Sequence, residues 1–384
     1  MDIYLVGGAV RDKRLGLPVS EHDWVVIGTT PEEMLKQGYK PVGKDFPVFL
    51  HPDSKDEYAL ARTERKTGPG YTGFETCADP DITLEQDLLR RDLTINAMAE
   101  TPEGELIDPY GGQEDLENGV LRHVSPAFSE DPVRILRVAR FAARFAHWGF
   151  RVAHETNALM RHMVAAGEVD HLVPERVWAE LVKALAEKTP ARFFDVLYGC
   201  GALAILFPEI EPLYIAAGQA GHEREDDRLP ALQAAVRLSD DPAIRFAALL
   251  CDTGLDAPAL ERLCERLRVP NAYRELAHHA IRHRVRVHAI AGLPASEVLD
   301  LLAAVDAFRR PDRFEDFLQV CRADAMAQQR DLDGRYPQAE LLHQACAAAR
   351  AVDTGALTGT GLAGPAIGQA LREQRIAAIE QLLE

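Results

Sequence analysis

The sequence of 384 residues is poor in several features that commonly assign a chain to a functional class. No apolar run approaches the roughly 18 residues that a membrane span requires, and the N-terminus carries no signal-peptide pattern. We therefore expect a cytoplasmic protein with no membrane partner. The six cysteines are far apart and form no C-x-x-C pair, so we expect buried reduced thiols rather than disulfides or zinc sites.

Positive charge is also scarce, because 43 Lys and Arg stand against 60 Asp and Glu. Phosphate contacts need basic side chains, so the surface as a whole is unsuited to indiscriminate nucleic-acid binding. Basic residues nevertheless outnumber acidic ones locally, from 122 to 192 and from 262 to 288. These stretches fit a polyanionic partner such as RNA, although a solvated helix face explains either stretch about equally well.

An acidic pair is the most informative feature that is present. Glu21 and Asp23 stand two positions apart where the apolar run D-W-V-V-I-G begins. Residues i and i+2 of a β-strand project from the same face, so both carboxylates can reach one site. Carboxylate oxygens and substrate phosphates are the ligands that Mg²⁺ prefers. The pair therefore predicts a catalytic divalent-metal site with Glu21 and Asp23 as the ligands.

A glycine turn, G-G-A-V-R-D, precedes this pair at residues 7–12. Gly7 and Gly8 let the backbone approach a triphosphate, and Arg11 adds a charge-assisted phosphate contact. A plain turn and a solvated acidic pair would explain each motif taken alone. The order of strand, Gly-Gly, Arg, short helix, acid-x-acid and second strand favours nucleotidyl transfer. A Rossmann dinucleotide turn is the main rival, and it fails because it needs G-x-G-x-x-G and an acid about 20 residues on.

The hydrophobic patterns predict an α+β head followed by an all-α remainder. We expect strands near 3–6, 23–28, 47–51 and 57–62, and helices near 9–15, 31–36 and 84–99. The Gly- and Pro-rich segment 66–81 is expected to be a mobile loop that acts as a gate. From Asp131 onward we expect helices and no further sheet. The predicted domains are a head (1–125), a helical neck that reads the nucleobase and binds RNA (126–215), and a helical body and tail (216–384).

Six ordered motifs resemble those of the bacterial class II CCA-adding tRNA nucleotidyltransferases. They are G-G-A-V-R-D at 7–12, E-H-D-W at 21–24, R-R-D-L-T-I-N-A at 90–97, D-P-Y-G-G at 108–112, E-D-P-V-R-I-L-R-V-A-R at 130–140 and P-E-R-V-W at 174–178. The resemblance implies a polymerase-beta-like nucleotidyltransferase head and template-independent addition and repair of the tRNA 3′-terminal CCA. The implied partners are CTP, ATP and the tRNA acceptor stem and 3′ end, with no DNA, and the implied cofactor is Mg²⁺.

The resemblance also extends the set of site residues. It implies that Arg91, Arg137 and Arg140 hold the incoming nucleotide and that Asp92 and Asn96 organise its ribose side. Asp131 and Arg134 form a donor-acceptor pair that accepts cytosine and adenine, which both offer an amino donor beside a ring-nitrogen acceptor. Without the family, a helix N-cap and a solvated arginine would be the preferred explanation of that pair.

The implied reaction is an attack by the tRNA 3′-hydroxyl on the α-phosphate beside two metal ions, with pyrophosphate as leaving group. Family members often carry Asp where Glu21 stands, and we expect metal binding to survive the extra methylene with altered geometry. A third metal carboxylate is left open between Glu57 and Glu64.

A second site has decayed in this sequence. Close relatives carry a His-Asp phosphohydrolase motif where this chain reads R-F-A-A-L-L-C-D-T-G-L, so Cys251 replaces the histidine and Leu255 the lysine. His and Asp remnants persist at His222, Asp252, His283, His288 and Asp324. An incomplete ligand set does not hold a transition metal. We therefore expect a degenerate HD domain that keeps its helical fold and lacks phosphohydrolase activity.

Two other functions compete with CCA addition. A bacterial poly(A) polymerase has the same head motifs and would extend many RNAs with ATP alone. A non-catalytic tRNA-binding protein would have lost the chemistry, which the intact acidic pair argues against. The sequence leaves open whether one protein adds both C and A.

Overall fold

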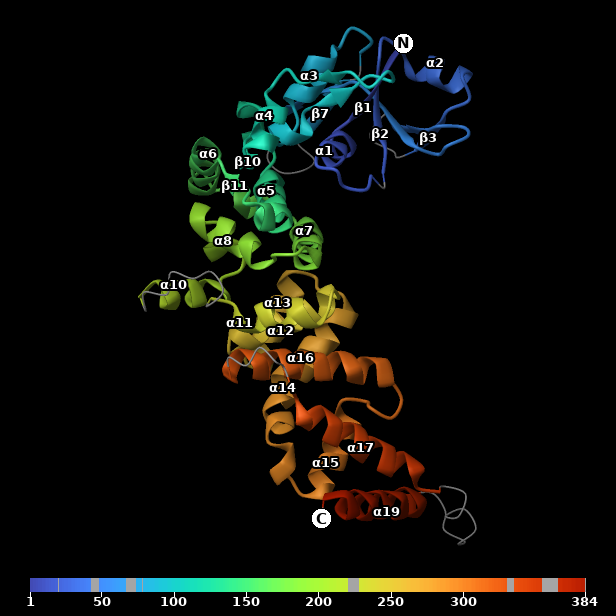
Figure 1. Cartoon of the computed structure of the whole chain (residues 1–384), viewed down its shortest axis with the longest axis vertical. Helices are drawn as coiled ribbons and strands as arrows, with labels where there is room; N and C mark the ends of the chain where they lie inside the picture. The colour runs from blue at the N-terminus through green and yellow to red at the C-terminus, as the bar shows by residue number, and fades with distance from the viewer. Residues whose placement is uncertain are drawn as a thin grey trace. The chain divides into compact units, whose positions relative to one another are not determined.

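The computed structural model of the chain describes residues 1–19, 21–42, 48–66, 74–77, 79–219, 228–329, 335–353 and 365–383. These residues form two compact units, Met1–Pro208 and Glu209–Glu384 (Figure 1). The predicted head-neck boundary at 125 lies inside the first unit, and the division into three domains stays a prediction. The α+β head and helical remainder are confirmed.

A mixed sheet of seven strands forms the centre of the head. In spatial order the strands are β3 (Lys40–Val42), β4 (Val48–Leu50), β5 (Glu57–Leu60), β2 (Asp23–Ile27), β1 (Asp2–Val6), β8 (Ala99–Glu100) and β9 (Leu106–Ile107). The β2–β5 pair is parallel, and the other neighbouring strands are antiparallel. Strands β3, β8 and β9 were not predicted, because two or three residues are too few to show an alternating pattern.

Both faces of this sheet are covered, which explains the continuous apolar run in β2. Val25 packs into a cluster with α3 (Leu84–Leu89), while Val26 on the opposite face packs against Met34 of α2 (Pro31–Lys36). Asp23 lies two residues before Val25 and so shares its face of the sheet. Helix α1 (Gly8–Arg14) follows β1 directly.

The helix predicted for 84–99 is wrong beyond Leu89. Helix α3 ends there, Leu93 is extended with φ −124° and ψ 147°, and a 3₁₀ turn, η1 (Thr94–Asn96), follows. The Asp92 carboxylate accepts hydrogen bonds from the Leu93 N–H and the Asn96 side-chain amide. Such local bonds compete with the helical pattern and redirect the chain.

The segment predicted as a mobile loop is partly a strand. β6 (Thr63–Lys66) and β7 (Phe74–Cys77) pair as an antiparallel hairpin. Residues 67–73 and 78 lie outside the described part of the chain, as do the side chains of 64–66 and 74–77. The predicted gate and the candidate ligand Glu64 are therefore not tested.

The rest of the first unit is mainly helical. Its helices are α4 (Gly112–Glu117), α5 (Val133–Phe145), α6 (His154–Ala165), α7 (Pro174–Ala186), α8 (Ala191–Cys200) and α9 (Leu203–Leu206), and α5 packs against both α7 and α8. The expectation of no strand after Asp131 is wrong, because β11 (Arg151–Val152) pairs in parallel with β10 (Val120–Leu121). A strand of two residues is again too short to show an alternating pattern in the sequence.

The second unit is helical throughout its described residues. Its helices are α10 (Glu211–Gln219), α11 (Pro230–Leu238), α12 (Pro242–Asp252), α13 (Ala257–Arg266), α14 (Asn271–His288), α15 (Ala295–Ala304), α16 (Pro311–Gln329), α17 (Pro337–Ala351) and α19 (Pro365–Leu383). No helix among the described residues has the length and apolar character needed to cross a bilayer. The five cysteines whose side chains are described are buried and unpaired.

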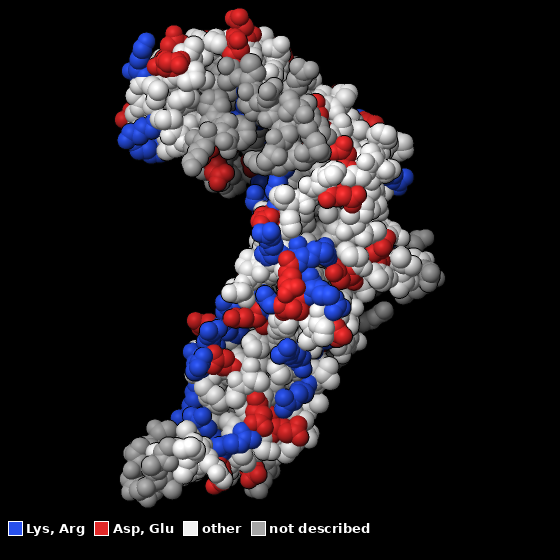
Figure 2. All heavy atoms as spheres, turned by 180° about the vertical axis from the view of Figure 1, so that it is seen from behind, with Lys and Arg blue, Asp and Glu red and all other residues white. Residues whose placement is uncertain are grey.

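Charged side chains of both signs share the surface. On the face that Figure 2 shows, Lys and Arg lie beside Asp and Glu over most of the helical part. Ion pairs such as Arg310–Glu275 and Arg372–Asp300 account for some of this mixing. The local excess of basic residues in the sequence therefore does not translate into one continuous basic surface on this face.

Candidate active site

A cavity of about 670 Å³ lies between the head sheet and helix α5, inside the first unit. It is lined by all twelve predicted site residues, namely Gly7, Gly8, Arg11, Glu21, Asp23, Arg91, Asp92, Asn96, Asp131, Arg134, Arg137 and Arg140. The sheet side supplies the carboxylates, and α5 supplies a row of arginines spaced three or four residues apart. Acidic and basic walls thus face one space from two different elements.

The glycine turn brings the backbone of the first strand close to Arg91. Gly7 has φ +69°, and a Cβ atom placed on it would lie 2.8 Å from Arg91 Nη1. A side chain here would meet both the strained backbone region and the guanidinium. Arg91 also contacts Asp87 at 3.3 Å, while its buried Nε has no hydrogen-bond partner among the described residues.

Asp23 is the first residue of β2, and Glu21 lies two residues before the strand begins. Glu21 and Asp23 are both accessible to solvent, and Asp23 pairs in register with Glu57 on the parallel neighbour β5. Partial burial raises the pKa of the Asp23 carboxyl; the Arg91 guanidinium opposes this shift and the Glu21 carboxylate adds to it. The two carboxylates of the pair are thus close enough to interact electrostatically.

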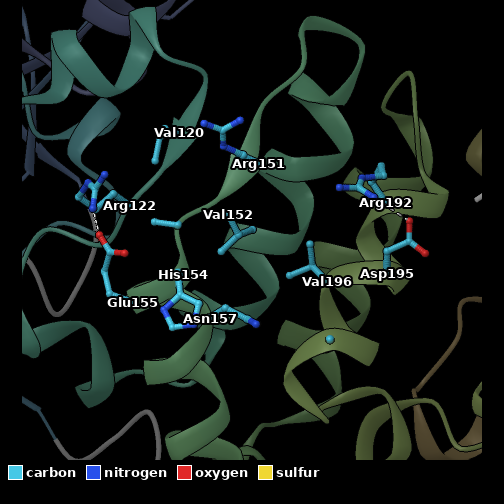
Figure 3. Close-up of a pocket in the computed structure, with 12 residues that line it drawn as sticks. Val120, Arg122, Arg151, Val152, His154, Glu155, Asn157, Arg192, Asp195 and Val196 are labelled. Carbon is cyan, nitrogen blue, oxygen red and sulfur yellow. Dashed lines mark hydrogen bonds and ion pairs between the residues drawn. The ribbon is translucent and has the colours of Figure 1, made fainter.

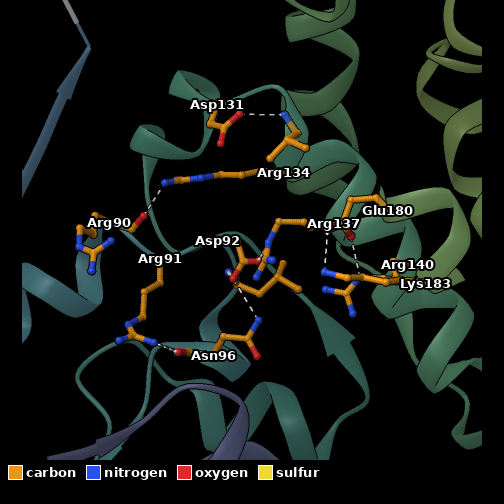
Figure 4. A network of polar contacts seen from close by, with 12 residues as sticks. Arg90, Arg91, Asp92, Asn96, Asp131, Arg134, Arg137, Arg140, Glu180 and Lys183 are labelled. Atoms are coloured by element: carbon orange, nitrogen blue, oxygen red, sulfur yellow. Dashed lines mark hydrogen bonds and ion pairs between the residues drawn. The ribbon is translucent and has the colours of Figure 1, made fainter. Parts of the chain in front are cut away.

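Asp92 anchors a buried polar network that reaches from the head to α5 (Figure 4). Arg137 Nε donates to Asp92 Oδ2 at 2.6 Å, and Asn96 Nδ2 donates to Asp92 Oδ1 at 3.0 Å. Burial alone would raise the pKa of Asp92, but Arg137 and these hydrogen bonds hold that pKa well below its ordinary value. Asp92 is therefore ionised and fixes the two side chains it contacts.

Arg11 is more enclosed than its predicted phosphate contact implies. Its side chain donates to Asn96 Oδ1 and pairs with Asp12 at 2.8 Å. Its guanidinium lies 5.1 Å from the centre of the Phe141 ring and 5.3 Å from that of Phe145. Burial lowers the pKa of Arg11, which Asp12 partly offsets. The residue lines the cavity and at the same time ties α1 to α5.

The structure does not join the side chains of the predicted base-reading pair. Arg134 donates to the carbonyl oxygens of Ala127 and Arg90 at 3.0 and 2.6 Å. Asp131 accepts a hydrogen bond from the Val133 N–H at 3.0 Å, so it also makes the cap interaction considered from the sequence. Both residues line the cavity, and each is oriented by a different partner.

The sequence analysis did not predict the two side chains of α7 that contact Asp131 and Arg140. Arg176 binds both oxygens of Asp131 at 3.1 and 2.8 Å, and Glu180 accepts from Arg140 Nε at 2.6 Å. Phe141 lies 4.4 Å from the Arg140 guanidinium carbon. Arg176 belongs to the P-E-R-V-W motif, which was the available signal, whereas nothing in the sequence pointed to Glu180.

The match to known families agrees with this geometry. Residues 3–122 match the family described as poly A polymerase head domain, and residues 149–214 match a probable RNA- and SrmB-binding site of polymerase A. The multifunctional CCA protein of Nitrosococcus oceani is 56% identical, across 99% of this chain and 98% of that protein. That of Thioalkalivibrio sulfidiphilus is also 56% identical, across 100% and 98%.

The chain belongs to the bacterial CCA-adding enzymes. Solved structures of CCA-adding enzymes share its fold. One with ATP has a TM-score of 0.69 and 21% identity, covering 98% of this chain and 86% of its own. The Bacillus stearothermophilus enzyme in complex with CTP has a TM-score of 0.67 and 23% identity, covering 99% and 89%.

The acidic pair of this CCA-adding enzyme suits the divalent metal that nucleotidyltransferases generally use. Two accessible carboxylates that lie close to each other are suitable hard-cation ligands. The described residues contain no group of three or more His, Cys, Asp or Glu side chains close enough to hold a metal ion. Glu57 is adjacent to Asp23 on the sheet and lines the same cavity, but its carboxylate is not gathered with the pair.

The residues expected to be remnants of an HD site make other contacts in the second unit. Asp252 accepts from the N–H groups of Ala231 and Leu232 at the start of α11. Asp324 is bound by His288 at 2.7 Å and lies 3.5 Å from Arg284. His222 lies outside the described residues. The predicted absence of phosphohydrolase activity stays a prediction.

Proposed function

We propose that the cavity between the head sheet and α5 is where this enzyme adds C, C and A to the tRNA 3′ end, using CTP and ATP. The observation that carries the proposal is the convergence of twelve residues, predicted from four separate sequence segments, on one space. CCA addition is the function of the family to which the chain belongs. We assign the individual roles as follows.

Glu21 and Asp23 would hold Mg²⁺. When bound, the metal would supply Lewis-acid activation of the attacking 3′-hydroxyl and charge neutralisation at the leaving pyrophosphate. Both carboxylates lie on the sheet side of the cavity, which leaves the α5 side for the nucleotide.

Arg91 is the best-placed residue for the triphosphate. Its Nε atom is buried, points to no acceptor among the described residues and carries a permanent charge, so a phosphate oxygen would satisfy it. Gly7 makes room for this side chain. Arg137 and Arg140 are each held by a carboxylate, and these pairs position the arginines for the base and sugar side of the substrate.

Asp131 and Arg134 would select the base. Asp131 offers acceptor oxygens to an exocyclic amino group, and Arg134 offers donors to a ring nitrogen or carbonyl oxygen. Cytosine and adenine satisfy both partners, whereas uracil and guanine present an N–H where the acceptor should be. In this structure Arg134 donates one N–H from each terminal nitrogen to a backbone carbonyl, and these two of its five donors fix the guanidinium at the cavity wall.

The partners follow from this assignment. We propose the tRNA acceptor stem and 3′ end as the polymer substrate, with no role for DNA or a membrane, and the cytoplasm as the compartment.

Incubation of tRNA lacking its last three nucleotides with CTP, ATP, UTP and GTP, separately and together, tests the function. We expect sequential incorporation of two C and one A with Mg²⁺, and no incorporation into a DNA hairpin of the same sequence. A poly(A) polymerase would instead extend tRNA that ends in C-C by many adenosines. A non-catalytic protein would bind the tRNA and add nothing.

A further inference from the structure

A second cavity in the first unit shares no lining residue with the active site. It has a volume of about 600 Å³ and lies between the β10–β11 pair, the start of α6 and helix α8. Three arginines from three different segments line it, Arg122, Arg151 and Arg192 (Figure 3). We call it the α6 pocket. The arginine lining suggests an anionic ligand.

Two of these arginines are already neutralised. Arg122 pairs with Glu155 and with Asp115 at 3.0 Å, and Arg192 pairs with Asp195 at 3.3 Å. Dashed lines in Figure 3 mark the pairs with Glu155 and Asp195. The charge available for a ligand is therefore smaller than the number of arginines suggests.

Arg151 supplies the uncompensated charge. Its side chain is exposed, and among the described residues its guanidinium has no hydrogen-bond or ion-pair partner. The parallel β10–β11 ladder sets Arg151 opposite Val120, which fixes the backbone from which the side chain extends. One full positive charge thus stands at the edge of a cavity large enough for a phosphate group.

The start of α6 lines the same pocket through Ala153, His154 and Glu155. The N-cap residue Ala153 makes no side-chain cap, and the acidic Glu155 lies in the first turn of the helix. Glu155 therefore already meets the positive end of the helix dipole, and Arg151 supplies the charge for a ligand. Strand β11 and helices α6 and α8 also lie within residues 149–214, the segment that matches an RNA-binding family.

We propose that the α6 pocket binds one backbone phosphate of the tRNA, held by the Arg151 guanidinium. The proposal rests on the proposed function, because it takes tRNA as the polymer. The pocket lies outside the active-site cavity. The contact should therefore contribute to the affinity for tRNA and not to the chemical step.

The test measures tRNA affinity at several salt concentrations for the wild type and for Arg151→Ala. Loss of one phosphate contact should weaken binding roughly 3- to 10-fold and reduce the slope of log affinity against log salt by about one. The KM for CTP and kcat at saturating tRNA should not change. Arg151→Lys, which retains the charge, should keep most of the affinity and checks that the strand tolerates substitution.

A second variant is expected to have the opposite effect on tRNA affinity. Glu155→Gln removes the acidic partner of Arg122, so it should tighten tRNA binding. Arg237→Ala, at an exposed arginine in α11, is the matched control and should change neither affinity nor slope by as much.

Three outcomes would overturn the proposal. Arg151→Ala could behave like Arg237→Ala, or Glu155→Gln could weaken binding. Alternatively, Arg151→Ala could change only inhibition by inorganic pyrophosphate, which would make a free anion the ligand. The wild type could bind tRNA with a slope of log affinity against log salt that depends on Arg151, and yet add no nucleotides. This result would refute the proposed function and would support the phosphate site in the α6 pocket.

Discussion

Arg176 of α7 binds both carboxylate oxygens of Asp131, at 3.1 and 2.8 Å, across 45 residues of sequence. Asp131 precedes α5, so this fork fixes a carboxylate at the cavity wall from a second helix. The geometry matters because a bidentate guanidinium sets the plane of the carboxylate, whereas an ammonium does not. The orientation of a proposed base-reading group therefore depends on a residue of another helix.

Replacement of Arg176 by lysine should reduce base selectivity. We expect the preference for CTP over UTP to fall about tenfold, which corresponds to about 1.4 kcal/mol of discrimination. Single-nucleotide incorporation into tRNA lacking CCA measures this ratio directly. Asp131→Asn, which removes the acceptor charge itself, should reduce the ratio at least as much. Unchanged selectivity in Arg176→Lys would show that Asp131 needs no external support.

Neutralisation of the acidic pair should abolish catalysis. Glu21→Gln and Asp23→Asn each remove a proposed metal ligand, and we expect kcat to fall by a factor on the order of 10³ or more. Binding of tRNA should persist, which a gel-shift assay checks. Glu57→Gln serves as the comparison, because Glu57 lies in register with Asp23 but is not gathered with the pair. Normal rates in the double amide variant would refute the proposed site.

Gly7→Ala and Gly16→Ala form a matched pair. Both positions have φ +69°, so both variants should lose at least roughly 1–2 kcal/mol of stability, and Gly7→Ala should lose more because the ψ of −128° at Gly7 lies outside the left-handed helical region. Only at Gly7 does the new Cβ meet Arg91, whereas nothing lies within 4 Å at Gly16. We expect KM for CTP and ATP to rise about tenfold in Gly7→Ala alone. Equal effects on KM in the two variants would remove Arg91 from the triphosphate site.

The Asp92–Arg137 pair should stabilise the first unit in a pH-dependent manner. The folded-state pKa of Asp92 is depressed, so its contribution is complete above the unfolded value of about 3.9 and is lost as pH falls toward the folded value. At pH 7, Asp92→Asn should lose about 2 kcal/mol, less than a fully buried pair because Arg137 is partly exposed.

Urea denaturation followed by tryptophan fluorescence measures this difference, because Trp24, Trp148 and Trp178 all lie in the first unit. The gap between wild type and Asp92→Asn should narrow as the pH is lowered toward 3. Asp2→Asn, at an exposed position, should show little difference at either pH. A gap that widens on acidification would contradict the assigned ionisation.

The purified protein should lack metal-dependent phosphatase and 2′,3′-cyclic phosphodiesterase activity. Cys251 is buried and stands where the sequence resemblance implies a metal-binding histidine, and Asp252 accepts hydrogen bonds at the start of α11. Burial raises the pKa of Asp252 to about 7, which further weakens it as an anionic ligand. Either activity, if lost in Asp252→Ala, would show that the second unit retains a working centre.

Local motifs predicted the α+β head and named residues that line one cavity, because their information is carried by neighbours in sequence. The close spacing of Glu21 and Asp23 and the evenly spaced arginines of α5 needed no contact between distant segments. The end of α3 was missed because the side chain of Asp92 redirects the backbone. Arg176 and Glu180 were missed as partners because their contacts join helices about 40 residues apart, which no periodicity encodes.

The enclosed position of Arg11 bears on how substrates enter and leave. Its guanidinium lies against two phenylalanine rings of α5, and its neighbour Asp12 pairs with Arg144 of the same helix at 2.9 Å. Movement of the head sheet away from α5 would remove the aromatic contacts of the buried Arg11 cation. It would also separate the ion pair between Asp12 and Arg144. We therefore expect the two walls to stay in contact while nucleotides are exchanged, with side-chain rotations accommodating bases of different size.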